Sequence, residues 1–154
     1  MRAQLSPTGR RILLSTVSSD SHTWNLVFLQ LLLEELGHEV VNLGPCVPDE
    51  LLIETAAAER PDAIVISSVN GHGHLDGVRL IRAVRADPRI GGIPAMIGGK
   101  LGVQGSEDTS YVRELTEAGF DAVFVEGAPE AALHAFLGVL PASTPARDLA
   151  VGTS

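Results

Sequence analysis

Short apolar runs rich in branched side chains alternate along the chain with longer segments whose apolar residues recur every three or four positions. The short runs are typical of strands buried on both faces, and the longer segments are typical of helices that cover a sheet. The clearest strand is the run AIVISSV at 63–69. The pattern predicts strands at 11–17, 38–43, 63–69, 93–97 and 122–125, alternating with helices at 23–36, 49–59, 75–86, 111–118 and 129–140.

Glycine and proline residues mark the ends of several of these elements. Gly37 and Gly119 follow the first and fourth helices, where glycine adopts the left-handed backbone at little cost. Pro48 stands where the second helix begins and Pro61 closes that helix. The pair of glycines at 98–99 is predicted to end the fourth strand.

Five strand–helix units in strict alternation predict a parallel sheet with helices on both faces. Five units are too few for an eightfold barrel. The sequence therefore predicts an α/β fold with a doubly wound five-stranded parallel sheet, of the flavodoxin-like (Rossmann-like) type. Sheets of this type bind ligands at the carboxyl ends of their strands, beside the point where the strand order reverses. The loops after the first, third, fourth and fifth strands are thus the candidate binding loops.

Composition limits the class of protein further. The chain has 154 residues, of which 45% are hydrophobic, so it can bury a sizeable core. We expect an N-terminal extension at 1–9, one folded domain at 10–140 and a flexible tail at 141–154. The net charge of −8 argues against sequence-independent binding to nucleic acid or an anionic membrane. The single Cys46 and the lack of a signal-peptide or membrane-spanning run lead us to expect a cytoplasmic protein.

The loop after the first strand offers a candidate metal ligand. Asp20 lies two residues before His22, close enough to accept a hydrogen bond from one ring nitrogen. The other nitrogen would then be free to bind a metal, with a fixed orientation and raised basicity. Alternatively, Asp20 or Ser21 caps the first helix and His22 is an ordinary residue of its first turn.

Small residues follow the third and fourth strands. Ser67 and Ser68 would let a bulky ligand approach the backbone and would offer it hydroxyl groups, or they simply fill space at the sheet edge. Gly98 and Gly99 allow an equally close approach, although a Gly-Gly pair is often only a turn. They do not form a phosphate-binding Walker loop, because no GK[ST] motif follows.

The segment His72-x-His74-x-Asp76 resembles part of the metal motif of metallo-β-lactamase-like hydrolases. In that motif a histidine directly follows the aspartate, whereas this chain has Gly77. One such segment also falls short of the ligands that a binuclear metal site needs.

Taken together, Asp20-x-His22, the segment SSV at 67–69 and the glycine pair at 98–99 resemble the signature of the cobalamin-binding domain family. Four further stretches, at 40–44, 67–76, 96–100 and 118–130, are similar to the small, cobalamin-binding subunit of glutamate mutase (methylaspartate mutase). The resemblance covers about residues 10–140, and its motifs occur in the family's order and spacing. The chain departs from the family pattern at Asn25, where the family has glycine.

The resemblance implies that His22 is the lower axial ligand of the cobalt, in place of the cofactor's own dimethylbenzimidazole base, and that Asp20 hydrogen-bonds to it. The displaced nucleotide tail would run beside the first strand and first helix. No catalytic residue beyond the axial ligand is implied for this chain. The implied cofactor-binding residues are Ser19, Asp20, Ser21, His22, Thr23, Ser67, Ser68, Val69, Gly98, Gly99, Lys100, Leu101, Gly102, Val103, Gln104 and Gly127.

The same resemblance implies an isomerase component: the cobalamin-binding subunit of an adenosylcobalamin-dependent carbon-skeleton mutase that converts L-glutamate to 3-methylaspartate. It would be active only with a large barrel-type catalytic subunit, which holds the substrate. The first helix has few polar positions, so it is either buried in the sheet layer or has an apolar face that meets a partner.

Three alternatives remain open. The chain could belong to a different mutase, it could be a stand-alone corrinoid carrier or sensor, or it could be a flavodoxin-like signalling domain without a cofactor. A receiver domain would need a phosphoacceptor aspartate after the third strand, where this chain has Ser67 and Ser68.

Overall fold

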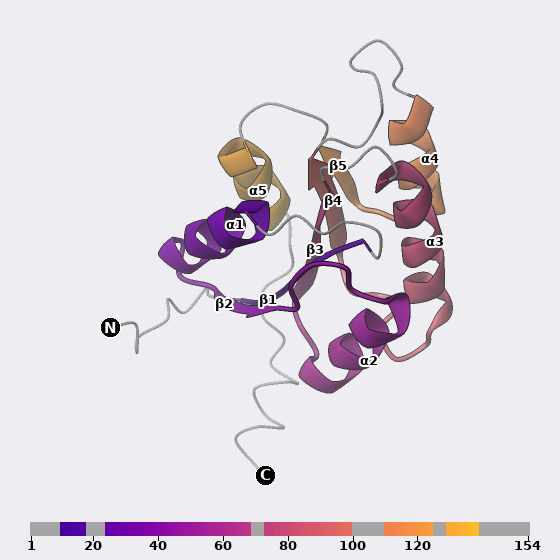
Figure 1. The fold of residues 1–154 in the computed structure, drawn as a ribbon, viewed down its shortest axis with the longest axis horizontal. Helices are drawn as coiled ribbons and strands as arrows, with labels where there is room; N and C mark the ends of the chain where they lie inside the picture. The colour runs from indigo at the N-terminus through magenta and orange to yellow at the C-terminus, as the bar shows by residue number, and fades with distance from the viewer. Residues whose placement is uncertain (1–9, 18–23, 69–72, 100–109, 125–128, 139–154) are drawn as a thin grey trace.

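The computed structural model describes residues 10–17, 24–68, 73–99, 110–124 and 129–138. Five parallel strands form one sheet in the order β2-β1-β3-β4-β5, which confirms the predicted doubly wound fold (Figure 1). The strands are β1 (Arg11–Thr16), β2 (Glu39–Asn42), β3 (Ala63–Ser68), β4 (Ala95–Gly99) and β5 (Ala122–Phe124). The helices are α1 (Trp24–Glu35), α2 (Asp49–Glu59), α3 (Gly73–Ala86), α4 (Ser110–Ala118) and α5 (Pro129–Gly138).

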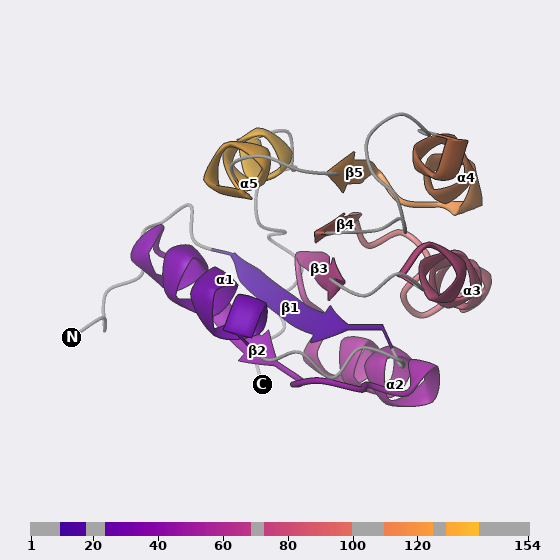
Figure 2. The ribbon, with the colours of Figure 1, turned by 45° about the horizontal axis from the view of Figure 1, so that its top comes forward.

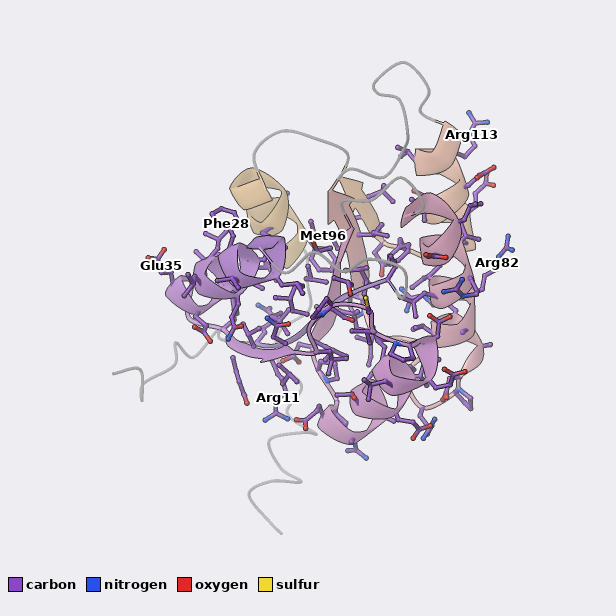
Figure 3. The ribbon with its side chains drawn as sticks, viewed as in Figure 1. Arg11, Phe28, Glu35, Arg82, Met96 and Arg113 are labelled. Atoms are coloured by element: carbon purple, nitrogen blue, oxygen red, sulfur yellow. The ribbon has the colours of Figure 1, made fainter. Side chains whose placement is uncertain are left out.

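Helices cover both faces of the sheet, and each face has its own apolar core. Helices α1 and α5 pack on one face, and α2, α3 and α4 pack on the other (Figure 2). Successive residues of β1 alternate between the cores: Ile12 and Leu14 join the α1/α5 core, and Leu13 joins the other. Met96 of β4 also lies in the α1/α5 core (Figure 3). Within the described residues, no helix is long and apolar enough to cross a membrane.

The fourth strand differs from its prediction. It runs from Ala95 to Gly99 rather than over 93–97. Ile93 belongs instead to the preceding turn, where its N–H donates to the carbonyl of Ile90 (3.1 Å) and its own carbonyl accepts from Arg85 Nη1 (2.6 Å). The strand does end at the glycine pair, but both glycines belong to it, because they pair with β3.

The remaining described boundaries lie within two residues of their predictions. Gly37 and Gly119 end α1 and α4 with φ angles of 95° and 140°, as predicted. A side chain at Gly119 would also meet Arg85, because an added Cβ would lie 2.8 Å from Arg85 Cγ. The predicted strand and helix ends at 69, 125 and 139–140 lie outside the described residues, as do the extension at 1–9 and the tail at 141–154.

The amino-terminal edge of the sheet is held by side chains that bond to the backbone. One carboxylate oxygen of Asp121 accepts hydrogen bonds from the N–H of Ala95 (2.8 Å) and from Arg85 Nη2 (2.9 Å). A carboxylate oxygen of Asp62 accepts from the N–H of Arg11 (2.9 Å) in the same way. These bonds satisfy strand N–H groups that have no ladder partner at the edge, so they fix where β1 and β4 begin.

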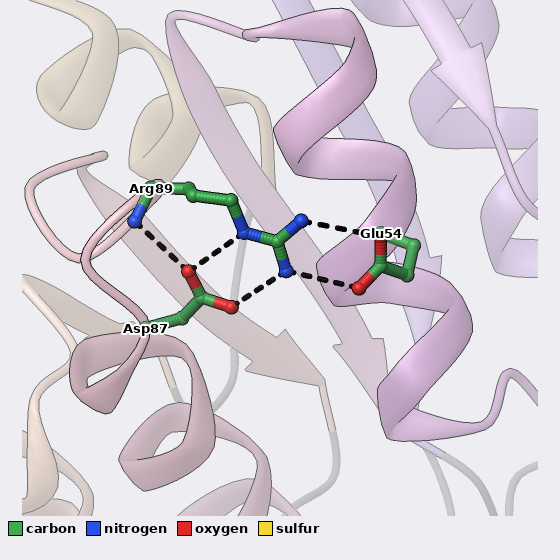
Figure 4. Close-up of polar contacts among 3 residues, drawn as sticks. All are labelled: Glu54, Asp87 and Arg89. Atoms are coloured by element: carbon green, nitrogen blue, oxygen red, sulfur yellow. Dashed lines mark hydrogen bonds and ion pairs between the residues drawn. The ribbon is translucent and has the colours of Figure 1, made fainter.

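A surface cluster joins α2 to the turn after α3 (Figure 4). Arg89 pairs with Asp87 (2.8 Å) and Glu54 (2.9 Å) through Nη2, and its Nε also donates to Asp87 (3.1 Å). Hydrogen bonds from Arg89 lower the pKa of both carboxyl groups. All three side chains are exposed to water or lie at the surface, so the cluster orients these segments but adds little to stability.

A buried histidine connects the α1–β2 turn to the start of β1. His38 is 7% exposed, and its Nδ1 accepts a hydrogen bond from the N–H of Arg10 (3.0 Å). Burial lowers the pKa of His38 below its ordinary value of 6.5; the charge of Arg10 lowers it further, and Asp62 opposes the shift. A protonated Nδ1 cannot accept this hydrogen bond.

We therefore predict that His38 makes stability depend on pH. The stabilisation is fully present above the histidine's unfolded pKa of about 6.5 and is lost as the pH falls from there toward its lower folded value. Urea unfolding should show that the free energy of unfolding falls more steeply between pH 8 and pH 5 for the wild type than for His38→Gln, because the glutamine side chain does not titrate. Equal slopes for the two proteins would contradict this role.

Candidate cofactor site

Three strand ends lie side by side at the carboxyl edge of the sheet. The register places Thr16 of β1 beside Ser67 of β3, and Ser67 beside Gly98 of β4. Ser68 and Gly99 form the next pair. The chain leaves β1 toward β2 on one side and later continues from β3 to β4 on the other, so the strand order reverses here. This is the position at which doubly wound sheets bind ligands.

Polar groups are buried at this edge. Ser15, Thr16 and Ser67 are at most 4% exposed. The hydroxyl of Thr16 donates to the carbonyl of Gly44 (3.2 Å), and that of Ser15 donates to the carbonyl of Thr16 (3.1 Å). The structure gives the Ser67 hydroxyl no hydrogen-bond partner among the described residues. A buried hydroxyl without a partner is costly, so this group is suited to a ligand at the edge.

The structure brings four of the sequence-predicted site residues together: Ser67, Ser68, Gly98 and Gly99. Neither glycine has a side chain to fill the space beside Ser67, so the backbone of β4 stays open to close approach. The other predicted residues lie outside the described part of the chain: Ser19, Asp20, Ser21, His22, Thr23, Val69, Lys100, Leu101, Gly102, Val103, Gln104 and Gly127. The axial role of His22 thus stays a prediction.

Sequence reasoning did not select Ser15 or Thr16, although both lie at the same edge. Their signal in the sequence is a pair of hydroxyl residues at the end of an otherwise apolar strand, RILLST. Thr16 matters for the geometry because its bond to Gly44 joins the end of β1 to the segment that follows β2.

A groove of about 480 Å³ lies between α1 and the segment after β2. Its polar part is a chain of amides: Asn42 Nδ2 donates to Gln30 Oε1 (3.0 Å), and Asn42 Oδ1 accepts from the N–H of Gly44 (2.9 Å). The groove therefore offers apolar walls with a few polar groups. Its lining residues are Leu26, Val27, Gln30, Asn42, Leu43, Gly44 and Pro45.

Asp76 of the segment that resembles a hydrolase metal motif, and Gly77 directly after it, make contacts within the fold. Asp76 pairs with Arg79 (2.9 Å), which also pairs with Asp49 (2.8 Å), and these carboxylates raise the pKa of Arg79. Gly77 packs closely, since an added Cβ would lie 2.8 Å from Ile97 Cδ1. Among the described residues, no group of three or more His, Cys, Asp or Glu could hold a metal ion. His72 lies outside these residues.

The fold is a doubly wound domain, a class that binds ligands at the carboxyl ends of its strands, here those of β1, β3 and β4. A family model described as the B12 binding domain matches residues 10–135. The chain belongs to this family. It is similar to the glutamate mutase sigma subunit of Fusobacterium nucleatum, with 32% identity over 120 residues that cover 78% of this chain and 88% of the relative.

Solved structures agree on the fold. A cobalamin-binding protein from Desulfitobacterium hafniense matches 83% of this chain with a TM-score of 0.64 and 22% identity, and the match spans 59% of that chain. The chemotaxis response regulator CheY4 of Vibrio cholerae matches 86% of this chain and all of its own, with a TM-score of 0.65 and 19% identity. Because both a cobalamin-binding protein and a response regulator match equally well, the fold alone does not select a ligand.

Proposed function

We propose that this chain is the cobalamin-binding subunit of an adenosylcobalamin-dependent carbon-skeleton mutase of the glutamate mutase type, which converts L-glutamate to 3-methylaspartate. The observation that carries the proposal is the carboxyl edge. There the buried hydroxyl of Ser67, which has no hydrogen-bond partner among the described residues, lies between the ends of β1 and β4. Membership of the B12-binding family and 32% identity to a glutamate mutase sigma subunit support it.

The residues at this edge fit the tail of a corrinoid. Ser67 has a buried hydroxyl group, and its neighbour Gly98 has no side chain to fill the space beside it. We propose that the nucleotide tail lies along these strand ends, with Val69, Gly127 and the segment 100–104 around it.

The cobalt would be bound by His22, with Asp20 holding the imidazole by a hydrogen bond to its other nitrogen. Ser19, Ser21 and Thr23 belong to the same loop, which directly precedes α1. This loop follows β1, a strand in which five of the six residues are buried. Binding through His22 would leave the cofactor base-off and its upper face open.

Adenosylcobalamin, when bound, supplies radical chemistry for the rearrangement of a carbon skeleton. This chain would hold the cofactor, orient its corrin ring and tune the cobalt through His22. It would contribute no acid, base or nucleophile to the substrate. We propose that a large barrel-type subunit covers the upper face and binds the substrate, so that the two chains form one enzyme.

Spectroscopy of the Co(II) state tests the axial role. We predict nitrogen coupling in the electron-paramagnetic-resonance spectrum of the complex with cobalamin. Labelling the protein's histidines with ¹⁵N should change the coupling from three lines to two, because ¹⁵N has spin 1/2 whereas ¹⁴N has spin 1. The cofactor's own base stays ¹⁴N, so two lines would identify a histidine as the ligand. The variant His22→Gly should lose the histidine coupling, and His134→Ala should retain it. Three lines in the labelled protein would show that the cofactor's base still binds the cobalt.

Activity tests the reaction. The chain, mixed with adenosylcobalamin and the larger glutamate mutase subunit of its own organism, should convert L-glutamate to 3-methylaspartate, because each chain supplies what the other lacks. Neither chain alone should be active. Cobalamin binding without this activity would point to a different mutase or to a carrier, and activity from this chain alone would contradict its role as half of an enzyme.

A further inference from the structure

Helix α1 has an apolar face that points away from the sheet. Val27, Phe28 and Leu31 are 44%, 45% and 59% exposed, whereas Leu26 and Leu33 on the opposite side are buried in the core. Positions 27, 28 and 31 share one helix face because residues three and four apart are neighbours. Figure 3 shows Phe28 directed outward from α1, with Glu35 at the far end of the helix. A helix that is apolar on both sides is usually covered on both sides.

This face lies close to the cofactor edge. Helix α1 begins at Trp24, directly after the loop that carries Asp20 and His22. At 1.5 Å per residue, Phe28 lies about 6 Å along the helix axis from that start, and Leu31 lies about 10 Å from it. Val27 and Phe28 thus lie in the half of α1 nearest the cofactor loop, and Leu31 lies just past the middle of the helix.

The groove between α1 and the segment after β2 extends the face. It has a volume of about 480 Å³, and Val27 belongs to both surfaces. The carbonyl of Gly44 in this groove accepts the hydrogen bond of Thr16 at the end of β1. The groove and the apolar face are therefore neighbouring parts of one surface, and the groove is joined to the buried end of β1 by this hydrogen bond. We call Val27, Phe28, Leu31 and this groove the α1 docking face.

The size of the face favours a partner that also covers the cofactor. A stable interface buries about 800 Å² on each partner, which three partly exposed side chains do not supply. A partner that also covers the carboxyl edge would bury the α1 docking face and that edge in one continuous interface. Charge favours a different chain over a second copy, because Glu35 is exposed at the end of the face and the net charge is −8.

We infer that the α1 docking face binds the larger mutase subunit. Apolar side chains of that subunit contact Phe28 and Leu31, one of them enters the groove, and a basic side chain faces Glu35. The inference rests on the proposed function, because it takes the subunit that covers the cofactor as the occupant.

Binding of the larger subunit to variants tests the inference. The double variant Phe28→Ser/Leu31→Ser should bind the larger subunit about tenfold more weakly, as loss of buried apolar contacts does at interfaces. Its affinity for cobalamin should stay within about twofold, since neither side chain is proposed to touch the cofactor. The matched control is Leu51→Ser, on α2 at the opposite face of the sheet and 47% exposed. Calorimetry measures both affinities, and circular dichroism checks the fold.

A charge variant gives a second measurement that does not depend on the apolar residues. Glu35→Lys should also weaken binding of the larger subunit, with an effect that shrinks as salt is added. Wild-type protein that fails to bind cobalamin would overturn the proposed function. Cobalamin binding with no association of the larger subunit, or with association that neither α1 variant weakens, would overturn the docking face alone. Self-association that the double variant abolishes would assign the face to a second copy and also overturn it.

Discussion

The reversal of strand order between β1 and β3 is the constraint on which the candidate site depends. The strands of this sheet are parallel and covered on both faces, so each connection must cross one face as a helix. The chain first passes from β1 to β2 on one side and later builds β4 and β5 on the other. Helices α1 and α3, which follow β1 and β3, therefore lie on opposite faces of the sheet, and doubly wound sheets bind ligands between two such strand ends.

The two edges of the sheet differ in how their polar groups are satisfied. At the amino edge, Asp62 and Asp121 accept hydrogen bonds from the first N–H groups of β1 and β4. At the carboxyl edge, Thr16 is bonded to Gly44, but the buried Ser67 hydroxyl has no partner among the described residues. The chain thus closes the amino edge with its own side chains, whereas at the carboxyl edge the described residues leave the Ser67 hydroxyl without a hydrogen-bond partner.

Much of the fold could be predicted because its signals are local. The continuous branched run at 63–69 predicted β3, and Gly37 and Gly119 predicted the ends of two helices. The start of β4 could not be predicted in this way. Ile93 has a side chain typical of a strand, but Arg85, eight residues earlier in the chain, donates a hydrogen bond to its carbonyl in the turn before β4.

The candidate site was predictable only in part. Periodicity and the rule for parallel sheets placed Ser67 and the glycines at 98–99 at one edge, and the register confirms that they are neighbours. The importance of Thr16 depends on its bond to Gly44, which is 28 residues away in sequence and leaves no local signal. The role of His22 rests on resemblance to a family, because no spacing rule distinguishes a cobalt ligand from a helix-start histidine.

A crystal structure of the chain with bound cobalamin tests the central claim most directly. We predict that a nitrogen of His22 binds the cobalt, and that the dimethylbenzimidazole tail lies off the metal along the ends of β1, β3 and β4. A cofactor whose own base still binds the cobalt, or one that lies away from this edge, would contradict it.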